Sequence, residues 1–237
     1  MNPVFLSAEW LKILFVNYRV PEDILAPYIP RGTKLDLFDG ECLVSLAGFQ
    51  FLNTRLSGIP LPFHQYFEEF NLRFYVVREE NHTRKRGVVF ISEFVNKSFF
   101  KALANTVMRE KYASLPMKHT CITSKERLKA DYGFKCKNRW NSASVLSERF
   151  AEDILPGSLD EFIAEHYWGY NKWYAGRTLE YKLDHPRWKR YKVLSFHTAI
   201  RFEDVYPKSF VPYLYAKAHS VQFIEGSPVR LSPSNLM

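Results

Sequence analysis

The segment at residues 69–76, Glu-Phe-Asn-Leu-Arg-Phe-Tyr-Val, constrains the fold of this chain more than any other. In a β-strand, successive side chains point to opposite faces, so Asn71, Arg73 and Tyr75 share one face and the intervening apolar residues share the other. Aromatic rings beside a few directed donors and acceptors are typical of a small-molecule site. The alternative is a sheet face whose polar residues meet water.

A second polar-aromatic segment, Glu-His-Tyr-Trp-Gly-Tyr-Asn, occupies residues 165–171. It follows Ser158-Leu159-Asp160-Glu161, which matches a capping box and predicts a short helix that runs into the segment. His166 and Tyr170 are therefore candidate site residues near a helix end.

Apolar runs of strand length recur along the chain, separated by turn residues. We expect strands at 11–18, 33–37, 41–51, 71–77, 87–95, 120–129, 132–141, 144–150, 178–183, 191–200 and 213–223. Turns are expected at Asp39-Gly40, at the basic run 84–86 and at Asp131, and helical segments at 21–30, 98–112, 158–166 and 201–206. Hairpins rather than βαβ crossovers predict a β-rich α+β fold, an antiparallel barrel or sandwich with a few peripheral helices.

The length and charge of the chain limit its partners. Its 237 residues suit a single domain over 1–237, and the formal net charge of +8 is spread along the sequence. The densest basic run, Arg84-Lys85-Arg86, lies at a predicted hairpin tip. We therefore expect no nucleic-acid partner, and the mildly basic surface favours an anionic ligand.

Targeting and metal-binding signals are absent from the sequence. The apolar run at residues 1–20 has no basic start and is interrupted by Glu9, Lys12 and Arg19, which argues against a signal peptide or a membrane span. The three cysteines have no paired spacing, so neither zinc nor a disulfide framework is expected. The chain is predicted to be cytoplasmic and to need no metal or other cofactor.

A set of short motifs extends over nearly the whole chain. They are Asn-Tyr-Arg-Val-Pro at 17–21, Pro-Arg-Gly-Thr at 30–33 with Leu35-Asp36, the segment 69–76, Arg-Gly-Val-Val-Phe-Ile-Ser-Glu at 86–93, His-Tyr-Trp-Gly-Tyr at 166–170, His-Pro-Arg-Trp at 185–188 and Gly-Ser-Pro-Val at 226–229. Together they resemble the bacterial YqjF-like family, also called domain of unknown function 2071. That family is similar to acetoacetate decarboxylase, so the resemblance implies a β-rich barrel or cone around a central cavity.

The resemblance does not extend to the chemistry of the decarboxylase. In that enzyme one lysine forms a Schiff base with the keto acid, and an adjacent lysine lowers its pKa. The comparable stretch here, residues 92–101, contains Lys97 and Lys101, and the chain has no pair of adjacent lysines. We therefore do not expect Schiff-base decarboxylation.

Arg73 and Glu93 are the candidates for ligand recognition and for acid–base chemistry. The Arg73 guanidinium can hold a ligand carboxylate through two parallel hydrogen bonds. Glu93 ends an apolar strand, where desolvation favours a raised pKa. We predict that both reach one interior space, and the structural alternative is an ion pair of Arg73 with Glu69 or Glu93.

Two histidines and a tyrosine complete the candidate site. His185 precedes Pro186, which favours an extended backbone at a strand end. The alternative for Tyr170 is aromatic packing in the core, and for His185 it is a capping or hydrogen-bonded core histidine. His166 and Glu165 are adjacent and point to opposite faces, so they are not expected to form a dyad. The spacing of His64, His166 and His185 does not suit a metal site.

The sequence thus predicts a single domain that holds a small, anionic organic molecule in a central cavity, at Asn71, Arg73, Glu93, His166, Tyr170 and His185. Any catalysis would be acid–base. The alternative function is a stress or detoxification accessory protein that acts through protein contacts without ligand chemistry.

Overall fold

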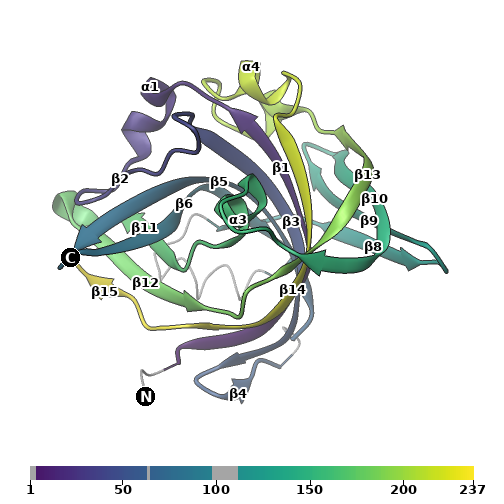
Figure 1. Cartoon of the computed structure of the whole chain (residues 1–237), viewed down its shortest axis with the longest axis horizontal. Helices are drawn as coiled ribbons and strands as arrows, with labels where there is room; N and C mark the ends of the chain where they lie inside the picture. Colours follow the sequence, from purple (N-terminus) through teal and green to yellow (C-terminus); the bar gives the residue numbers. More distant parts are fainter. Residues whose placement is uncertain (1–3, 63–64, 98–111) are drawn as a thin grey trace.

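The computed structural model describes residues 4–62, 65–97 and 112–237, and these form one 15-stranded sheet with few helices (Figure 1). The longer strands are β1 (Leu6–Arg19), β3 (Leu43–Leu56), β5 (Phe67–Glu80), β6 (Thr83–Val95), β8 (Met117–Thr123), β9 (Arg127–Cys136), β10 (Arg139–Asp153), β12 (Thr178–Asp184), β13 (Lys189–Ala199) and β14 (Ser220–Leu231). The shorter ones are β2 (Lys34–Leu35), β4 (Ile59–Pro60), β7 (Tyr112–Ser114), β11 (Trp168–Lys172) and β15 (Asn235–Leu236).

The helices are short and lie between strands. They are α1 (Glu22–Leu25), α3 (Leu159–Ala164), α4 (Val211–Leu214) and the 3₁₀ turns η1 (Ala26–Tyr28), η2 (Tyr174–Gly176) and η3 (Phe202–Asp204). The predicted capping box begins α3: the Ser158 hydroxyl accepts a hydrogen bond from the Glu161 N–H, and the Glu161 carboxylate accepts one from the Gly157 N–H. The helix expected at 98–112 falls on residues 98–111, outside the described part, while Tyr112 begins β7.

The sheet curls so that distant parts of the chain meet. Its strand order is β15-β12-β11-β6-β5-β3-β1-β14-β13-β10-β9-β8, and an additional pairing of β12 with β14 brings this path back on itself. Most neighbouring strands are antiparallel, as predicted. Two pairs are parallel instead, β11 with β6 and β7 with β6, and neither of them is a hairpin.

Three local predictions are corrected by the pairing. The expected partner of β2 is β3, but β2 pairs with β5, and only Phe38 and Glu41 bridge across the Asp39-Gly40 turn. No strand is expected at residues 53–64, but β3 continues to Leu56 and its end pairs with β4. The strand predicted at 213–223 begins only at Ser220, because α4 occupies residues 211–214.

Two predicted turns lie elsewhere. The β5–β6 hairpin turns at Asn81-His82, both with positive φ, and residues 84–86 belong to β6 itself. Asp131 is in the middle of β9, and the chain reverses at Lys137-Asn138, again with positive φ. Neither turn contains glycine, so the sequence carried no strong signal for it.

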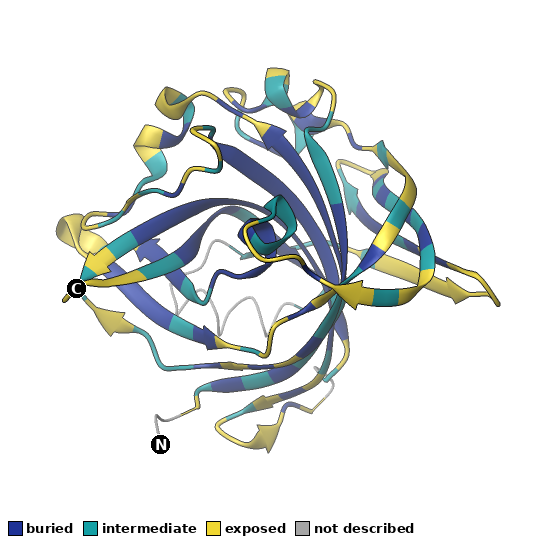
Figure 2. Cartoon of the chain, viewed as in Figure 1, coloured by how far each residue is buried: buried dark blue, intermediate teal, exposed yellow. Residues whose placement is uncertain are grey.

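Both faces of β5 are buried (Figure 2). Phe70, Leu72 and Phe74 belong to a hydrophobic cluster that includes β9 residues and the segment before β14. Tyr75, on the opposite face, belongs to a second cluster with α3 and Trp188. The polar face of residues 69–76 is therefore an interior face, not a solvated one.

Glycines from the shared motifs allow close approach of neighbouring strands. A Cβ on Gly87 would lie 2.6 Å from the carbonyl oxygen of Trp168, its partner on β11, and one on Gly169 would lie 2.0 Å from Cζ of Tyr181. One on Gly226, where φ is +84°, would lie 1.8 Å from the carbonyl oxygen of Trp10. These positions explain why glycine recurs in three of the motifs.

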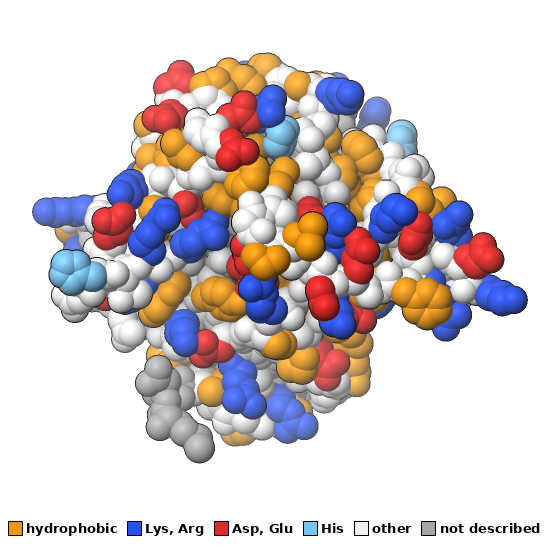
Figure 3. All heavy atoms as spheres, in the orientation of Figure 1, with side chains coloured by type: hydrophobic (Ala, Val, Ile, Leu, Met, Phe, Trp, Pro, Cys, Tyr) orange, Lys and Arg blue, Asp and Glu red, His pale blue; other side chains and the backbone are white. Residues whose placement is uncertain are grey.

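The surface carries mixed charge. On the face drawn in Figure 3, basic side chains are interspersed with acidic ones and with small apolar areas. In the described part of the chain, every helix is too short or too polar to cross a membrane.

Candidate functional site

Arg73 lies near the middle of β5, with its side chain on the interior face. The residue is 7% exposed, and its Nη2 donates a hydrogen bond of 3.2 Å to the carbonyl oxygen of Ile163, in the last turn of α3. Its guanidinium carbon lies 4.4 Å from the centre of the Phe15 ring and 5.7 Å from that of Tyr75. A helix C-terminus and two ring faces partly offset the buried positive charge.

The ion pair proposed as the structural alternative is not formed. Both oxygens of Glu69 already accept hydrogen bonds, from Asn71 Nδ2 at 2.7 Å and from the Tyr112 hydroxyl at 2.6 Å. Among the described residues, no carboxylate forms an ion pair with Arg73, and its buried Nε has no hydrogen-bond acceptor. Arg73 is thus a buried cation without a carboxylate counterion in this part of the chain.

Glu93 reaches the same interior face as Arg73. On β6 it lies directly opposite Asn71, while Arg73 lies opposite Phe90, with a bulge in β6 between the two pairs. Glu93 is fully buried, and the Asn71 carbonyl oxygen Oδ1 is buried without a donor in the described structure. We refer to Glu69, Asn71, Arg73, Glu93 and Tyr112 as the interior polar cluster.

A carboxylate–imidazole pair lies beside this cluster. Asp36, just after β2, accepts a hydrogen bond from His166 Nε2 at 3.2 Å and another from Arg86 Nε at 2.6 Å. The His166 ring packs on Tyr75, with 4.6 Å between ring centres, and edge-on to Phe162. Tyr75 therefore contacts both Arg73 and His166.

Burial determines the protonation state of His166. Desolvation lowers the pKa of His166 to about 4, although the hydrogen bond to Asp36 opposes this shift. Burial alone would raise the pKa of Asp36, but hydrogen bonds from His166 and Arg86 outweigh it and hold that pKa below its usual value. A neutral imidazole that donates from Nε2 to a carboxylate must carry a bare Nδ1. That Nδ1 is buried and has no partner among the described residues.

The acid stability of the protein should reflect His166. Its pKa is lower in the folded state than in the unfolded chain, so protonation favours unfolding, and stability should fall as the pH drops from 6.5 to 4. The expected loss is about 2–3 kcal/mol. Asp36 loses its contribution only below this range. Urea unfolding at pH 7 and 4.5 measures the loss, and His166→Gln, which keeps a donor toward Asp36, should remove it. Identical pH profiles for the two proteins would contradict this assignment.

A buried hydrogen-bond chain fixes Tyr75. Its hydroxyl pairs with Ser45 Oγ, which donates to Asn17 Oδ1, and Asn17 Nδ2 donates to Gln222. These residues come from β5, β3, β1 and β14, so four neighbouring strands hold the ring against Arg73 and His166.

Among the described residues, no hydrogen bond or ring contact joins the remaining two candidates to the interior polar cluster, although burial and, to a smaller extent, the Arg73 charge lower the pKa of His185. Tyr170 belongs to the other hydrophobic cluster, and its hydroxyl donates to the Lys85 carbonyl oxygen. His185 stacks between Trp188 and Tyr167, with ring centres 3.9 and 4.5 Å away, and lines a surface pocket. His64 is outside the described residues, and no three metal-binding side chains converge among those described.

Sequence reasoning did not select Asp36 as a site residue. Asp36 does belong to one of the motifs that resemble the YqjF-like family, Leu35-Asp36, and this motif could have marked it. Its hydrogen-bond partner His166 is 130 positions away, so the pair was not predicted. Tyr112 was expected to end a helix, so its contact with Glu69 was not predicted either.

Comparison with known proteins identifies the family. The family model DUF2071, described as an uncharacterized conserved protein, matches residues 7–228, and the chain belongs to this family. The chain is also 27% identical over 168 residues to the uncharacterized protein YqjF of Bacillus subtilis (strain 168). That match covers 68% of this chain and 65% of YqjF.

Solved structures show the same fold at low sequence identity. The enduracididine biosynthesis enzyme MppR with bound HEPES has a TM-score of 0.69 at 12% identity, covering 100% of this chain and 88% of MppR. An acetoacetate decarboxylase-like enzyme of Sphingomonas wittichii RW1 has a TM-score of 0.68 at 13% identity, covering 98% and 92%. A further MppR structure, complexed with pyruvate, has a TM-score of 0.64 at 12% identity, covering 100% and 91%. The expected acetoacetate decarboxylase-like fold is thereby confirmed.

Proposed function

We propose that this protein binds a small organic carboxylate at Arg73, inside the curve of the sheet. The observation that carries the proposal is a buried guanidinium with one backbone acceptor and no carboxylate counterion among the described residues. A buried cation is costly to leave uncompensated, and a ligand carboxylate supplies both the charge and two acceptor oxygens.

The neighbouring groups favour a ligand with a second polar function. Asn71 Oδ1 and His166 Nδ1 are buried acceptors without donors in the described structure. A hydroxyl or enol group on the ligand would donate to one of them, which makes hydroxy acids and enolisable keto acids the preferred class of ligand.

The neutral His166, oriented by Asp36, is the candidate base, so any reaction would be proton transfer. MppR, of the same fold, is a precedent for pyruvate as a ligand.

A thermal-shift screen tests the proposal. Keto acids, hydroxy acids and aromatic acids are added at pH 7, with the corresponding amides and esters as uncharged controls. A ligand present at 100 times its dissociation constant should stabilise the fold by about 2.7 kcal/mol. Stabilisation by acids but not by their amides supports the proposal. If no acid of any class shifts the transition, the proposal fails and the accessory role through protein contacts is favoured.

Schiff-base chemistry is not expected. The chain lacks adjacent lysines, and neither Lys97 nor Lys101 has the neighbour by which the decarboxylase obtains a free amine. Incubation with acetoacetate followed by borohydride should therefore leave both lysines unmodified by mass spectrometry. An acetoacetate decarboxylase treated in parallel is the positive control, and a reduced adduct on either lysine would refute the expectation.

A further inference from the structure

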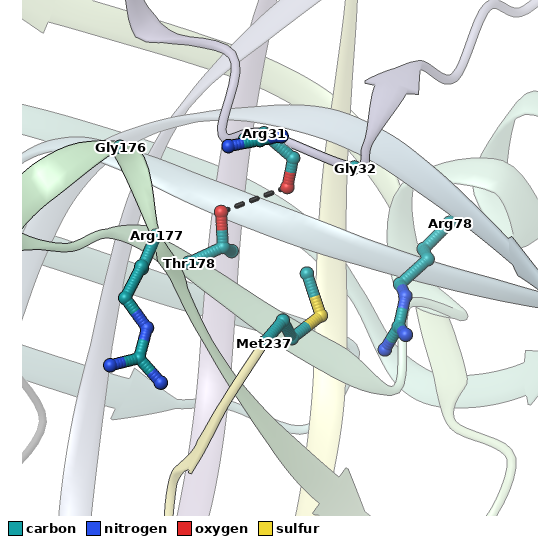
Figure 4. A pocket seen from close by; sticks show the side chains of 7 residues that line it. All are labelled: Arg31, Gly32, Arg78, Gly176, Arg177, Thr178 and Met237. Atoms are coloured by element: carbon teal, nitrogen blue, oxygen red, sulfur yellow. Dashed lines mark hydrogen bonds between the residues drawn. The ribbon is translucent and has the colours of Figure 1, made fainter.

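A pocket of about 330 Å³ opens on the protein surface, apart from the interior polar cluster (Figure 4). Its lining comes from the loop before β2, the start of β12, strand β5 and the C-terminal segment: Arg31, Gly32, Arg78, Gly176, Arg177, Thr178 and Met237. An adjoining hollow of about 300 Å³ shares Arg31, Gly176 and Arg177 with it and adds Ile29, Lys172 and Trp173. The two hollows form one basic, partly apolar depression.

Hydrogen bonds fix the walls of this depression. Thr178 is buried and its hydroxyl donates to the Arg31 carbonyl oxygen at 2.8 Å, while the Met237 N–H donates to the Thr178 carbonyl oxygen at 2.8 Å. The Trp173 N–H donates to the Arg177 carbonyl oxygen at 2.7 Å, across a turn in which Ala175 and Gly176 have positive φ. The loops that carry the two shared arginines are therefore held in place.

The charges of the depression do not balance. Arg78 and Lys85 pair with Glu80 and Glu180. Arg31, Lys172 and Arg177 form no ion pair with any described residue, and none of the described residues that line the two hollows is acidic. Even with a free carboxylate on Met237, these three cations leave a net charge of about +2, which matches a phosphate dianion better than a monocarboxylate.

We propose that Arg31 and Arg177 bind the phosphate group of a small organic phosphate. Both arginines line both hollows and are exposed, so their mobile side chains can reach a phosphate bound where the hollows meet. The organic part of the ligand then extends along Ile29 and Trp173, which supply an apolar and aromatic wall. This inference does not depend on the proposed function, because it uses none of the interior residues.

Calorimetric titration with phenyl phosphate, inorganic phosphate and benzoate tests the site. Phenyl phosphate should bind saturably, and benzoate, which has the same ring but a single charge, should bind at least about tenfold more weakly. Inorganic phosphate should also be weaker, because it lacks the ring. The same order should hold in Arg73→Met protein, in which the interior guanidinium is gone.

Paired variants separate this site from diffuse surface charge. Arg31→Gln with Arg177→Gln should weaken phenyl phosphate by at least about 100-fold, roughly tenfold for each guanidinium. Arg127→Gln with Arg139→Gln removes the same charge from exposed positions on β9 and β10 and should change little. The proposal is overturned if phenyl phosphate does not bind, if both double variants weaken it equally, or if only Arg73→Met abolishes binding.

Discussion

A Gly226→Ala variant is expected to lose more than about 4 kcal/mol of stability, a large fraction of the roughly 5–15 kcal/mol that keeps a typical domain folded. The added Cβ would lie 1.8 Å from the carbonyl oxygen of Trp10 and 2.9 Å from Cα of Leu11. Both contacts are with the backbone of β1, which is hydrogen-bonded to β3 on its other side. Because neither strand can move without breaking the pairing of the other, the clash cannot be relieved locally.

Gly58 provides the matched control. Its φ is also +84°, but a Cβ there would meet no atom within 4 Å. Gly58→Ala therefore measures the cost of the left-handed backbone alone, about 1–2 kcal/mol. Urea midpoints, or soluble yield and circular dichroism where the variant does not fold, compare the two. Equal losses for the two variants would show that the close approach of β14 to β1 is not what requires glycine.

Arg73→Met is expected to weaken carboxylate binding by about 30-fold or more while leaving the fold intact. Loss of a buried, charge-assisted hydrogen-bond partner costs about 2–5 kcal/mol of binding free energy, which corresponds to a reduction in affinity of about 30-fold or more. Methionine keeps much of the side-chain volume and removes a charge that has no carboxylate counterion in the described structure. The unfolding free energy without ligand should therefore be unchanged within about 1 kcal/mol, or higher.

Arg190→Met is the control for this variant. Arg190 pairs with Glu152 and Asp160, so its loss should lower stability slightly and leave ligand affinity unchanged. Urea unfolding and calorimetry of both variants separate the two roles. A loss of several kcal/mol in Arg73→Met without ligand would instead assign Arg73 to holding α3 through the Ile163 carbonyl.

Local patterns in the sequence predicted local structure well. The alternation at residues 69–76 correctly divided β5 into two faces, and the Ser158 capping box correctly began α3. Turns without glycine, such as Lys137-Asn138, were missed because they lack the Asn-Gly or Asp-Gly pair that marks a hairpin most strongly, although asparagine itself favours turns.

Long-range pairing was beyond local patterns. The partner of β2 and the parallel neighbours of β6 depend on how the sheet curls, which no window of sequence records. The same limit applies to the site. The alternation placed Asn71 and Arg73 on one face, but the hydrogen bond between His166 and Asp36 joins residues 130 positions apart in the sequence, which no local pattern predicts.

The pairing of β1 with β14 has a consequence for how the protein is made. Leu6 pairs with Leu231, so the edge of β1 that does not pair with β3 finds its partner only after β14, more than 200 residues further along, has been synthesised. At about 5–20 residues per second, that interval is roughly 10–50 s. Throughout it, the backbone N–H and C=O groups along one edge of β1 have no strand to pair with, and such edges promote aggregation. Folding yield in the cell should therefore depend on translation speed and chaperone capacity as well as on the stability of the finished fold.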